Sequence, residues 1–538
     1  MRFLRFLLLC PALLLAACAT LPDNEARVAS RQMTDIDSTL SEAVATSIAG
    51  HPGLSGFHLL ANGLDAFAAR VLLADKAERT IDAQYYLFHD DLTGNLLLQH
   101  LLAAADRGVR VRLLIDDMDT AGRDLDFAAL DAHPHFELRL FNPYASRSSR
   151  VLEMLTRFGS VTRRMHNKSF TVDGVVTVVG GRNIGDEYFS ADPTVEFGDL
   201  DVLGAGPVAS DVSAVFDAYW NHSLAYPAST LSREDVMPDR IDALRVQLRS
   251  IAGQSQGSAY AERLRASPLV EQLTHQQLSL HWGRAKVFAD GPDKLLTSPD
   301  DRSTHMGPRL QADVHDATSE VLIFSPYFVP GDTGVDWLAA LVERGVRVRI
   351  LTNSLASNDV GVVHAGYSRY RKDLLRAGVG LYEAKARSAK PEEDQDQHWG
   401  GSSRASLHAK TFAFDRQRLF VGSLNLDPRS AVLNTEMGIV FDNAQLAGMV
   451  GDWFDTRLRD VAYELRLDER GDIEWVEHSA DGDRIHQTEP NTGSLKRMSV
   501  WFARSLPIEG QLCSAQATPG RKTPDCRNGH LVAPRQNV

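Results

Sequence analysis

The feature that most constrains this sequence is that one half of it repeats the other. The hexapeptide RGVRVR occurs at residues 107–112 and 344–349, and each copy follows an amphipathic run, 96–105 or 335–342. Strand-like apolar runs precede the amphipathic runs and follow the hexapeptides, at residues 81–86, 113–115, 321–324 and 350–351. A strand, a helix and a second strand in that order predict a βαβ unit. We therefore expect an α/β fold of two tandem halves, each with a mostly parallel sheet covered by helices.

A second pattern repeats at nearly the same offset. In both copies a lysine, an aspartate and an asparagine follow a histidine by two, seven and seventeen residues. The residues are His166, Lys168, Asp173 and Asn183 in the first copy and His408, Lys410, Asp415 and Asn425 in the second. One His-x-Lys would mean little. Two copies with three matched spacings favour a functional site over the alternative, two purely structural hairpins.

Each motif fits a β-hairpin with a two-residue turn. Alternate residues of a strand share a face, so the histidine and the lysine lie together. The predicted register places His166 opposite Asn183 and His408 opposite Asn425. Histidine, lysine and asparagine form an anion site with a titratable nucleophile. With two such clusters, one histidine can attack phosphorus while the other protonates the departing oxygen.

These residues match the H-x-K-x4-D-x6-G-[GS]-x-N signature of the phospholipase D superfamily, and the resemblance covers roughly residues 55–460. It implies two α/β/α sandwich halves related by a pseudo-twofold axis, with both motifs at their interface. It also implies that His166 is the nucleophile, which forms a phosphohistidine, and that His408 is the acid and later the base. The residues implied to hold the phosphate are Lys168, Lys410, Asn183, Asn425 and Ser423.

The resemblance also assigns roles to acidic residues. Asp173 and Asp415 belong to the catalytic signature, but hairpin turns favour aspartate, so we expect a turn or ion-pair role rather than direct catalysis. The family carries a further acidic residue downstream that orients the histidine. Glu436 fits this position, and Asp199 is the nearest equivalent in the first half, although the spacings differ. Gly181 stands where the second half has a serine, and we expect this asymmetry to be tolerated.

The amino terminus predicts export. Residues 1–17 have a short basic start and an apolar run too short to span a bilayer, which is typical of a secretory signal. Leu15 to Cys18 resemble a bacterial lipobox, which implies lipidation of Cys18; the alternative is an ordinary signal with an incidental cysteine. The absence of aspartate after Cys18 implies an outer-membrane anchor that faces the periplasm. There, Cys513 and Cys526 would form a disulfide or remain free thiols.

A basic segment precedes the first motif. Five arginines fall within residues 147–164, and its apolar residues fall on one helical stripe. Such a helix would suit anionic lipid headgroups, but it could equally be a solvated charged face. The chain as a whole has 57 Lys+Arg against 70 Asp+Glu, a net charge of −13, which disfavours a nucleic-acid-coating protein.

Further stretches, 325–331, 369–372 and 422–430, resemble the bacterial cardiolipin synthase C branch of the superfamily. That resemblance implies transfer of a phosphatidyl group from phosphatidylglycerol or phosphatidylethanolamine to a second phosphatidylglycerol. The alternatives are a periplasmic phospholipase D that uses water, a non-catalytic lipid-binding lipoprotein and a nuclease. We expect phospholipid and membrane partners and a monomer that is sufficient for catalysis. An unidentified activating protein is a further candidate partner. Carboxylate or Cys/His clusters at metal-ligand spacing do not accompany the motifs, so we expect neither a metal nor a cofactor.

The sequence predicts six segments. They are a signal at 1–17, a tether and leading helix at 18–54, the first half at 55–226, a connecting region at 227–300, the second half at 301–465 and a tail at 466–538. A polar loop, 388–403, precedes the second motif and would be either a mobile lid or an ordinary insertion.

Overall fold

A computed structural model describes residues 20–34, 36–147, 150, 153, 158–192, 195–274, 278–358, 360–386 and 404–504. Four predictions lie outside these residues: the signal at 1–17, lipidation at Cys18, the lid at 388–403 and the pairing of Cys513 with Cys526. Among the described helices, none combines the length and apolar character needed to cross a bilayer.

The predicted βαβ unit is present in the first half. Strand β2 (Thr80–Tyr85), helix α4 (Leu92–Asp106) and strand β3 (Arg110–Asp116) follow in that order, and the two strands pair in parallel. Asp91 begins α4, because its side chain accepts the backbone N–H of Gly94. Helix α5 (Asp124–Asp131) then leads to β4 (Phe136–Phe141), which pairs in parallel with β3.

The second half repeats this unit. Strand β12 (Glu320–Phe324), helix α14 (Gly331–Glu343) and strand β13 (Arg347–Asn353) follow in order, and β12 and β13 pair in parallel. Strand β14 (Gly380–Ala384) continues the parallel run after helices α15 (Gly361–Tyr367) and α16 (Arg371–Arg376). The duplication seen in the sequence is therefore a duplication of structure.

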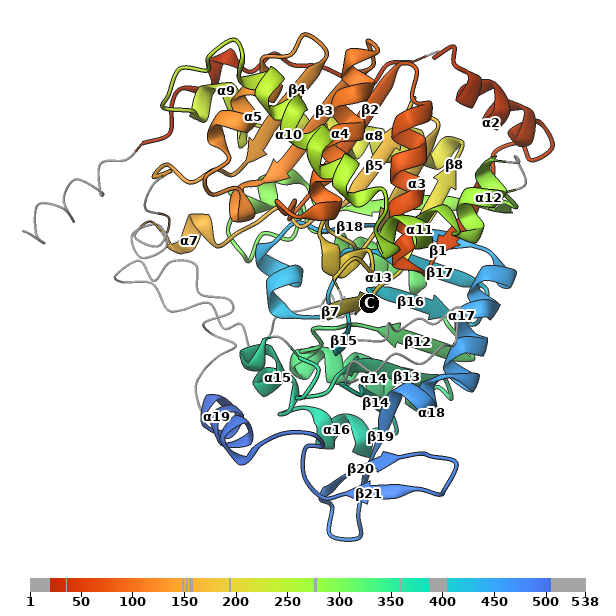
Figure 1. The fold of residues 1–538 in the computed structure, drawn as a ribbon. Coiled ribbons are helices and arrows are strands. Elements are labelled where there is room, and N and C mark those ends of the chain that lie inside the picture. The colour runs from red at the N-terminus through yellow and green to blue at the C-terminus, as the bar shows by residue number, and fades with distance from the viewer. Residues whose placement is uncertain are drawn as a thin grey trace, which may run out of the picture.

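The described residues form two large sheets, drawn one above the other in Figure 1. The first has the order β10-β1-β8-β6-β5-β2-β3-β4-β9 and the second β11-β18-β17-β16-β12-β13-β14-β19-β20-β21. Eight strands from β1 to β9 and from β11 to β19 hold equivalent places. The remaining strands of the first sheet are β1 (Ser55–Leu60), β5 (Ser169–Val172), β6 (Val176–Gly180), β8 (Asp201–Ala205), β9 (Ala225–Pro227) and β10 (His281–Gly283). Those of the second are β11 (Ala285–Ala289), β16 (Thr411–Phe414), β17 (Arg418–Gly422), β18 (Met437–Asp442), β19 (Ala462–Leu467), β20 (Ile473–Glu477) and β21 (Arg484–His486).

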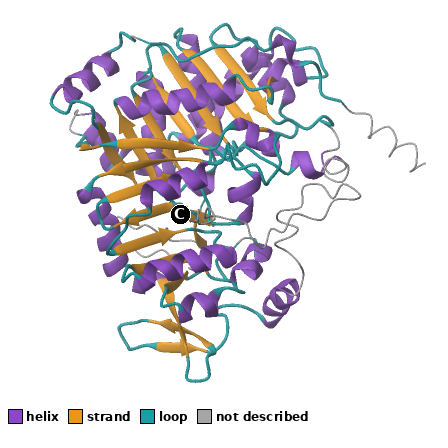
Figure 2. Ribbon diagram, turned by 180° about the vertical axis from the view of Figure 1, so that it is seen from behind, coloured by secondary structure: helices purple, strands orange, loops and turns teal. Residues whose placement is uncertain are grey.

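Helices cover the sheets on both faces, as the view from behind shows (Figure 2). In the first half they are α2 (Thr39–Ala49), α3 (Gly63–Lys76), α7 (Phe158–Val161), α8 (Pro207–Trp220) and α9 (Ala228–Leu231). The connecting region adds α10 (Arg240–Ser255), α11 (Ala259–Arg265) and α12 (Pro268–Thr274). The second half has α13 (Met306–Val314), α17 (Ala444–Thr456), α18 (Leu458–Val461) and α19 (Ser494–Arg504) in addition to those named above.

The sheets are mixed, so the expectation of mostly parallel sheets was wrong. Among the described strands of the two sheets, parallel pairing joins only β2-β3-β4 and β12-β13-β14. Beyond β2 and β12 the sheets grow through the motif hairpins, β5-β6 and β16-β17, which are antiparallel. A hairpin needs no crossover helix, which is why only part of each half follows the βαβ pattern.

The register of the motif hairpins differs by one residue from the prediction. Ser169 pairs with Val179 and Thr411 pairs with Val421, which leaves three-residue loops, 173–175 and 415–417, instead of two-residue turns. Asp173 and Asp415 begin these loops with positive φ, 49° and 53°. Aspartate tolerates this left-handed conformation, so a longer loop closes without glycine at its first position. The asparagines therefore do not lie directly opposite the histidines.

The two halves share a core. Apolar side chains of β1, β6, β8 and α8 form one cluster with those of β12, β16, β17, β18 and α17, and Phe57 stacks on Phe441 with 4.3 Å between ring centroids. A separate two-stranded sheet joins β7 (Val195–Gly198) of the first half to β15 (Arg404–Leu407) of the second in parallel. The halves therefore meet through both apolar packing and backbone hydrogen bonds.

The segments outside the halves are more ordered than the sequence suggested. Residues 20–34, placed in a tether, lie on the first half, where the Ser30 N–H donates to Asn221 and the Gln32 N–H to Asp217. The connecting region supplies an edge strand to each sheet, β10 and β11. The described part of the predicted tail, residues 466–504, continues the second sheet through β20 and β21 and includes α19. Hydrogen bonding to the preceding strand extends the sheet past the sequence boundary.

The motif aspartates bind backbone N–H groups of neighbouring strands rather than the histidines. The buried carboxylate of Asp173 accepts the N–H groups of Arg79 and Thr80 at 2.9 Å, at the start of β2. That of Asp415 accepts the N–H of Glu320 at 2.9 Å, at the start of β12. Burial raises the pKa of Asp415, but the backbone N–H groups lower it to about 2.

We predict that Asp173→Ala lowers the free energy of unfolding by about 2 kcal/mol or more, because it leaves buried backbone N–H groups without an acceptor. Urea unfolding followed by circular dichroism measures this change, and Asp415→Ala should behave in the same direction. A catalytic role for these aspartates would instead remove activity with an unchanged unfolding midpoint.

Candidate active site

The two His-x-Lys motifs meet where the halves touch. The backbone N–H of His166 donates to the carbonyl of Thr435 at 2.9 Å, and that of His408 donates to the carbonyl of Gly198 at 2.8 Å. Each histidine is thus held by the residue that precedes an acidic side chain of the opposite half. These backbone hydrogen bonds fix the position of each histidine relative to the opposite half.

The acidic partners are exchanged between the halves. His166 Nδ1 lies 2.8 Å from Glu436 Oε2, and His408 Nδ1 lies 2.6 Å from Asp199 Oδ2. All four residues are buried. The sequence singled out both acids as histidine-orienting residues but paired each with the histidine of its own half, which was wrong. The exchange follows from the packing of one half on the other, which no spacing within a half reports.

Both lysines are buried at the same place. Lys168 Nζ donates to the carbonyl of His166 at 2.7 Å. Lys410 Nζ bonds to the carbonyl of His408 and lies 2.8 Å from Nδ1 of the same imidazole. Two buried lysines thus lie beside two buried carboxylates, and burial lowers the pKa of Lys168 well below its ordinary value. A bound anion would favour the charged form of both lysines.

The histidines favour the neutral form. Burial lowers the pKa of His166 to about 4, with Lys168 and Lys410 acting in the same direction against Glu436. Burial, Lys410 and Lys168 also lower the pKa of His408 well below its ordinary value. With Nδ1–H directed at a carboxylate, a neutral imidazole presents the lone pair of Nε2, the form that attacks an electrophile.

The two acids differ in their affinity for a proton. Burial raises the pKa of Glu436, but His166 and Lys168 outweigh it and hold that pKa below its ordinary value. For Asp199, burial prevails over Lys410 and Arg182, and the pKa is raised. The carboxylate beside His166 is therefore the more firmly ionised of the two.

The predicted phosphate-binding residues lie in different surroundings. The two asparagines differ in their hydrogen bonds, and Ser423 does not fit the predicted role of binding phosphate. Asn183 accepts from the N–H of Leu87 and donates to the hydroxyl of Tyr188. Asn425 is buried, and its Oδ1 has no hydrogen-bond partner among the described residues. The hydroxyl of Ser423 donates to Glu436 Oε2 at 2.5 Å. Ser423 therefore positions the partner of His166 and does not face a substrate.

Aromatic rings that the sequence reasoning missed enclose the histidines. Tyr86 lies edge-on to His166 at 5.0 Å between centroids, and Tyr188 lies edge-on to His408 at 5.2 Å. Phe197 stacks on His408 at 5.3 Å. These rings displace water from the imidazoles and so contribute to the lowered pKa values. Tyr86 directly follows β2, so its position at a strand end was the one signal available in the sequence.

The arginines of the basic segment are engaged within the protein. Arg147 pairs with Asp117 and Asp124, and Arg164 donates to Asp116 at 2.8 Å. Arg163 donates to backbone carbonyls of the connecting region. Arg157 and most of the apolar stripe lie outside the described residues. The described arginines therefore do not form the lipid-facing surface that the sequence left open.

Within the described residues, no group of three or more His, Cys, Asp or Glu side chains is arranged to hold a metal ion. The expectation of a metal-free site stays a prediction.

The Gly181 position leaves no room for a side chain, which gives a physical reason for the asymmetry with Ser423. A Cβ atom there would lie 2.6 Å from Oδ2 and 2.8 Å from Cγ of Asp199, whose carboxylate is held by His408 and the N–H of Leu200. We predict that Gly181→Ser lowers phosphodiester turnover about 100-fold by displacing Asp199. Steady-state kinetics measure this loss.

The reciprocal change, Ser423→Gly, is the matched control. It removes one hydrogen bond to Glu436 without a steric conflict, and about tenfold lower turnover is expected. Equal effects of the two substitutions would contradict the proposed constraint at Gly181.

Comparison with known proteins agrees with this geometry. The sequence profile of a family described as "Cardiolipin synthase, PLD-like domain" matches residues 72–220 and 310–458, one copy in each half. Cardiolipin synthase C of Escherichia coli (strain K12) is 46% identical over 87% of this chain and 99% of that protein. Cardiolipin synthase A of Pseudomonas putida is 27% identical over 73% of this chain and 66% of that protein.

The fold also resembles a solved structure, phosphatidylserine synthase of Haemophilus influenzae Rd KW20. The TM-score is 0.54 with 14% sequence identity, over 86% of this chain and 97% of that one. At this identity the likeness concerns the fold alone. Taken with the two profile matches and the relative aligned over nearly its whole length, it leads to one assignment: the chain belongs to the cardiolipin synthase family of phospholipase D-like proteins.

Proposed function

We propose that this protein is a phosphatidyltransferase that makes cardiolipin from phosphatidylglycerol and a second phospholipid, either phosphatidylglycerol or phosphatidylethanolamine. The observation that carries the proposal is the crossed pairing of His166 with Glu436 and of His408 with Asp199, beside two buried lysines. The likeness to cardiolipin synthase C over nearly the whole chain supports the same reaction.

In the first step Nε2 of His166 attacks the phosphorus of the donor lipid. The P–O bond to the headgroup alcohol breaks as the P–N bond forms, and His408 gives its proton to the departing oxygen. The products are a phosphatidyl group on His166 and free glycerol or ethanolamine. The ionised Glu436 stabilises the positive charge that develops on the His166 imidazole.

In the second step a hydroxyl of phosphatidylglycerol attacks the phosphatidyl group, and the neutral His408 takes its proton. The P–N bond breaks, which releases cardiolipin and restores both histidines. Water in place of this hydroxyl would give phosphatidic acid, the product of the alternative hydrolase. The aromatic rings around the imidazoles exclude water and so favour transfer.

The proton on His408 depends on the substrate. Without an anion, burial and the two lysines keep the pKa of His408 low. A bound phosphodiester places negative charge beside the same groups and raises that pKa. The ionised Glu436 beside His166 supports His166 as the nucleophile, because it stabilises the charge that develops on that imidazole, and His408 is then the acid.

We also propose the cellular setting. Relatives of this kind suggest association with membranes, and the lipobox at Cys18 would anchor the protein to the outer membrane, facing the periplasm. Since residues 20–34 lie on the first half, such an anchor would hold the body close to the bilayer. One chain supplies both histidines, so a monomer completes the site, and an activating protein would act on an already formed centre.

The first test is the product. Full-length protein is incubated with labelled phosphatidylglycerol, with and without phosphatidylethanolamine, and cardiolipin and phosphatidic acid are separated. We expect cardiolipin from the wild type and none from His166→Ala, and a dependence on phosphatidylethanolamine would identify the donor. Phosphatidic acid alone would make the protein a hydrolase, and the absence of both products would contradict the proposal.

The second test separates the roles of the histidines. A donor lipid with a p-nitrophenol headgroup needs no acid, because nitrophenolate leaves unassisted. We expect His408→Ala to release about one nitrophenolate per chain and then stall, since the phosphatidyl group on His166 lacks a base for its removal. His166→Ala should give no burst. The opposite pattern would make His408 the nucleophile.

A further inference from the structure

The last helix, α19, presents large apolar side chains to the outside of the molecule. Leu495 is 74% exposed, Met498 59% and Phe502 61%. Trp501, 67% exposed, lies beside them. Isolated exposed apolar residues are common, but four large ones within eight residues form a patch of the kind that marks an interaction site. We call these four residues the outer stripe.

Three residues of the outer stripe lie on a different face of α19 from the one that packs on the protein. At 3.6 residues per turn, Leu495, Met498 and Phe502 are spaced by three and four residues and share one face. Val500 lies on another face, where it is buried against Leu355 and Ala365. The helix thus has one apolar face toward the second half and a second apolar face away from it.

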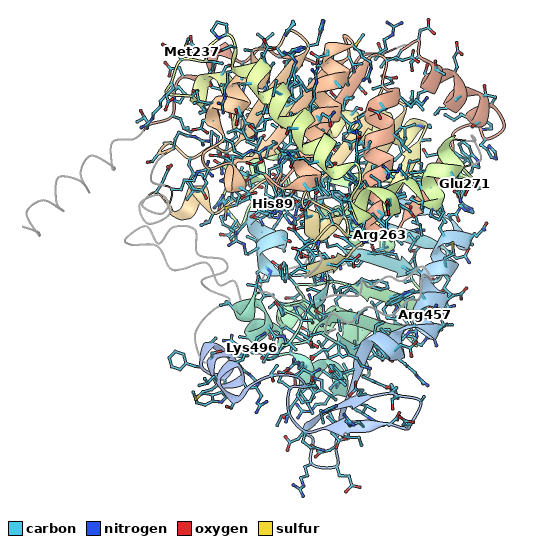
Figure 3. The ribbon with its side chains drawn as sticks, in the orientation of Figure 1. His89, Met237, Arg263, Glu271, Arg457 and Lys496 are labelled. Carbon is cyan, nitrogen blue, oxygen red and sulfur yellow. The ribbon has the colours of Figure 1, made fainter. Side chains whose placement is uncertain are left out.

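The charge of α19 complements an anionic surface. Its sequence, SLKRMSVWFAR, contains Lys496, Arg497 and Arg504 but no acidic residue, in a chain whose net charge is −13. Lys496 lies at the surface of this helix (Figure 3). Basic residues beside an exposed apolar stripe that includes Trp and Phe are typical of helices that lie in a lipid headgroup region.

The residues that directly precede α19 fix this helix to the second half. Just before it, the carboxylate of Glu489 accepts from Arg371 Nη1 at 2.6 Å and lies 3.3 Å from His364 Nε2. Asn491 donates to the hydroxyl of Tyr463 at 3.0 Å. Arg371 and His364 are buried, so these contacts are shielded from water. The outer stripe therefore has a defined direction relative to the body.

A series of side-chain contacts connects α19 to the catalytic centre. Leu355, which packs on Val500, follows by two residues Asn353, at the end of β13. The side chain of Asn353 accepts from the N–H of Leu407 and donates to its carbonyl, at 3.0 and 2.9 Å. Leu407 directly precedes His408. In Figure 1, α19 lies at the lower left, beside the second half, and the described chain begins at the upper left, on the first half.

We propose that the outer stripe of α19 docks on an anionic phospholipid bilayer, with its basic residues among the headgroups. This surface goes beyond the proposed function, since docking needs neither histidine. It would hold the second half, which carries His408, at the membrane, where the lipid substrate of the proposed reaction resides.

The test uses full-length His166→Ala protein, so that its outcome does not depend on whether the proposed reaction occurs. Vesicles of phosphatidylglycerol and phosphatidylethanolamine with brominated acyl chains quench tryptophan that enters the apolar region. We expect quenching that is largely lost in Trp501→Phe. We further expect Leu495→Glu with Met498→Glu to weaken vesicle binding at least tenfold, and Lys496→Glu to reduce the preference for anionic over phosphatidylcholine vesicles.

The matched controls are Val246→Glu on α10 and Met449→Glu on α17, whose side chains are 67% and 52% exposed. They should bind vesicles within twofold of the parent protein. Equal binding by the α19 variant and these controls would overturn the proposal. Equal quenching of the parent protein and of Trp501→Phe would also overturn the proposal, because Trp501 would then not enter the apolar region. A protein partner or another part of the chain would cover the outer stripe instead.

Discussion

The structure depends on the exchange of acidic partners between the halves. Glu436 orients His166 and Asp199 orients His408, while the backbone carbonyls just before these acids fix the same histidines. Neither motif histidine takes its acid from its own half. The shared apolar core and the β7–β15 pairing are therefore conditions of the site, since a small rotation of one half would separate both imidazoles from their carboxylates.

The two motifs lie in unequal surroundings. Lys410 Nζ lies 2.8 Å from Nδ1 of His408, whereas Lys168 Nζ donates to the backbone carbonyl of His166. Glu436 receives an additional hydrogen bond from Ser423 and has a pKa below its ordinary value, whereas burial raises the pKa of Asp199. Glycine at position 181 leaves the space that Asp199 occupies, and serine at position 423 positions Glu436.

Much of this was predictable from the sequence, and what was missed has a common cause. Local periodicity located β2, α4, β3 and their counterparts, repeated spacing identified His166, His408 and the lysines, and the family resemblance identified both acids. One-residue errors in hairpin register arose because loop length depends on φ values that aspartate can adopt. The crossed pairs, the role of Ser423 and the rings of Tyr86 and Tyr188 depend on contacts between distant segments, which spacing does not encode.

The common strand order limits where the halves can diverge. Eight equivalent strands carry the motifs and the shared core, so insertions among them would disturb the crossed pairs. The edges carry no such constraint: the first sheet gains β10, and the second gains β20, β21 and the segment leading to α19. The buried contacts of Glu489 with Arg371 and His364 then tie this addition to the body. An element that meets an external surface can be added at such an edge without altering the chemistry between the halves.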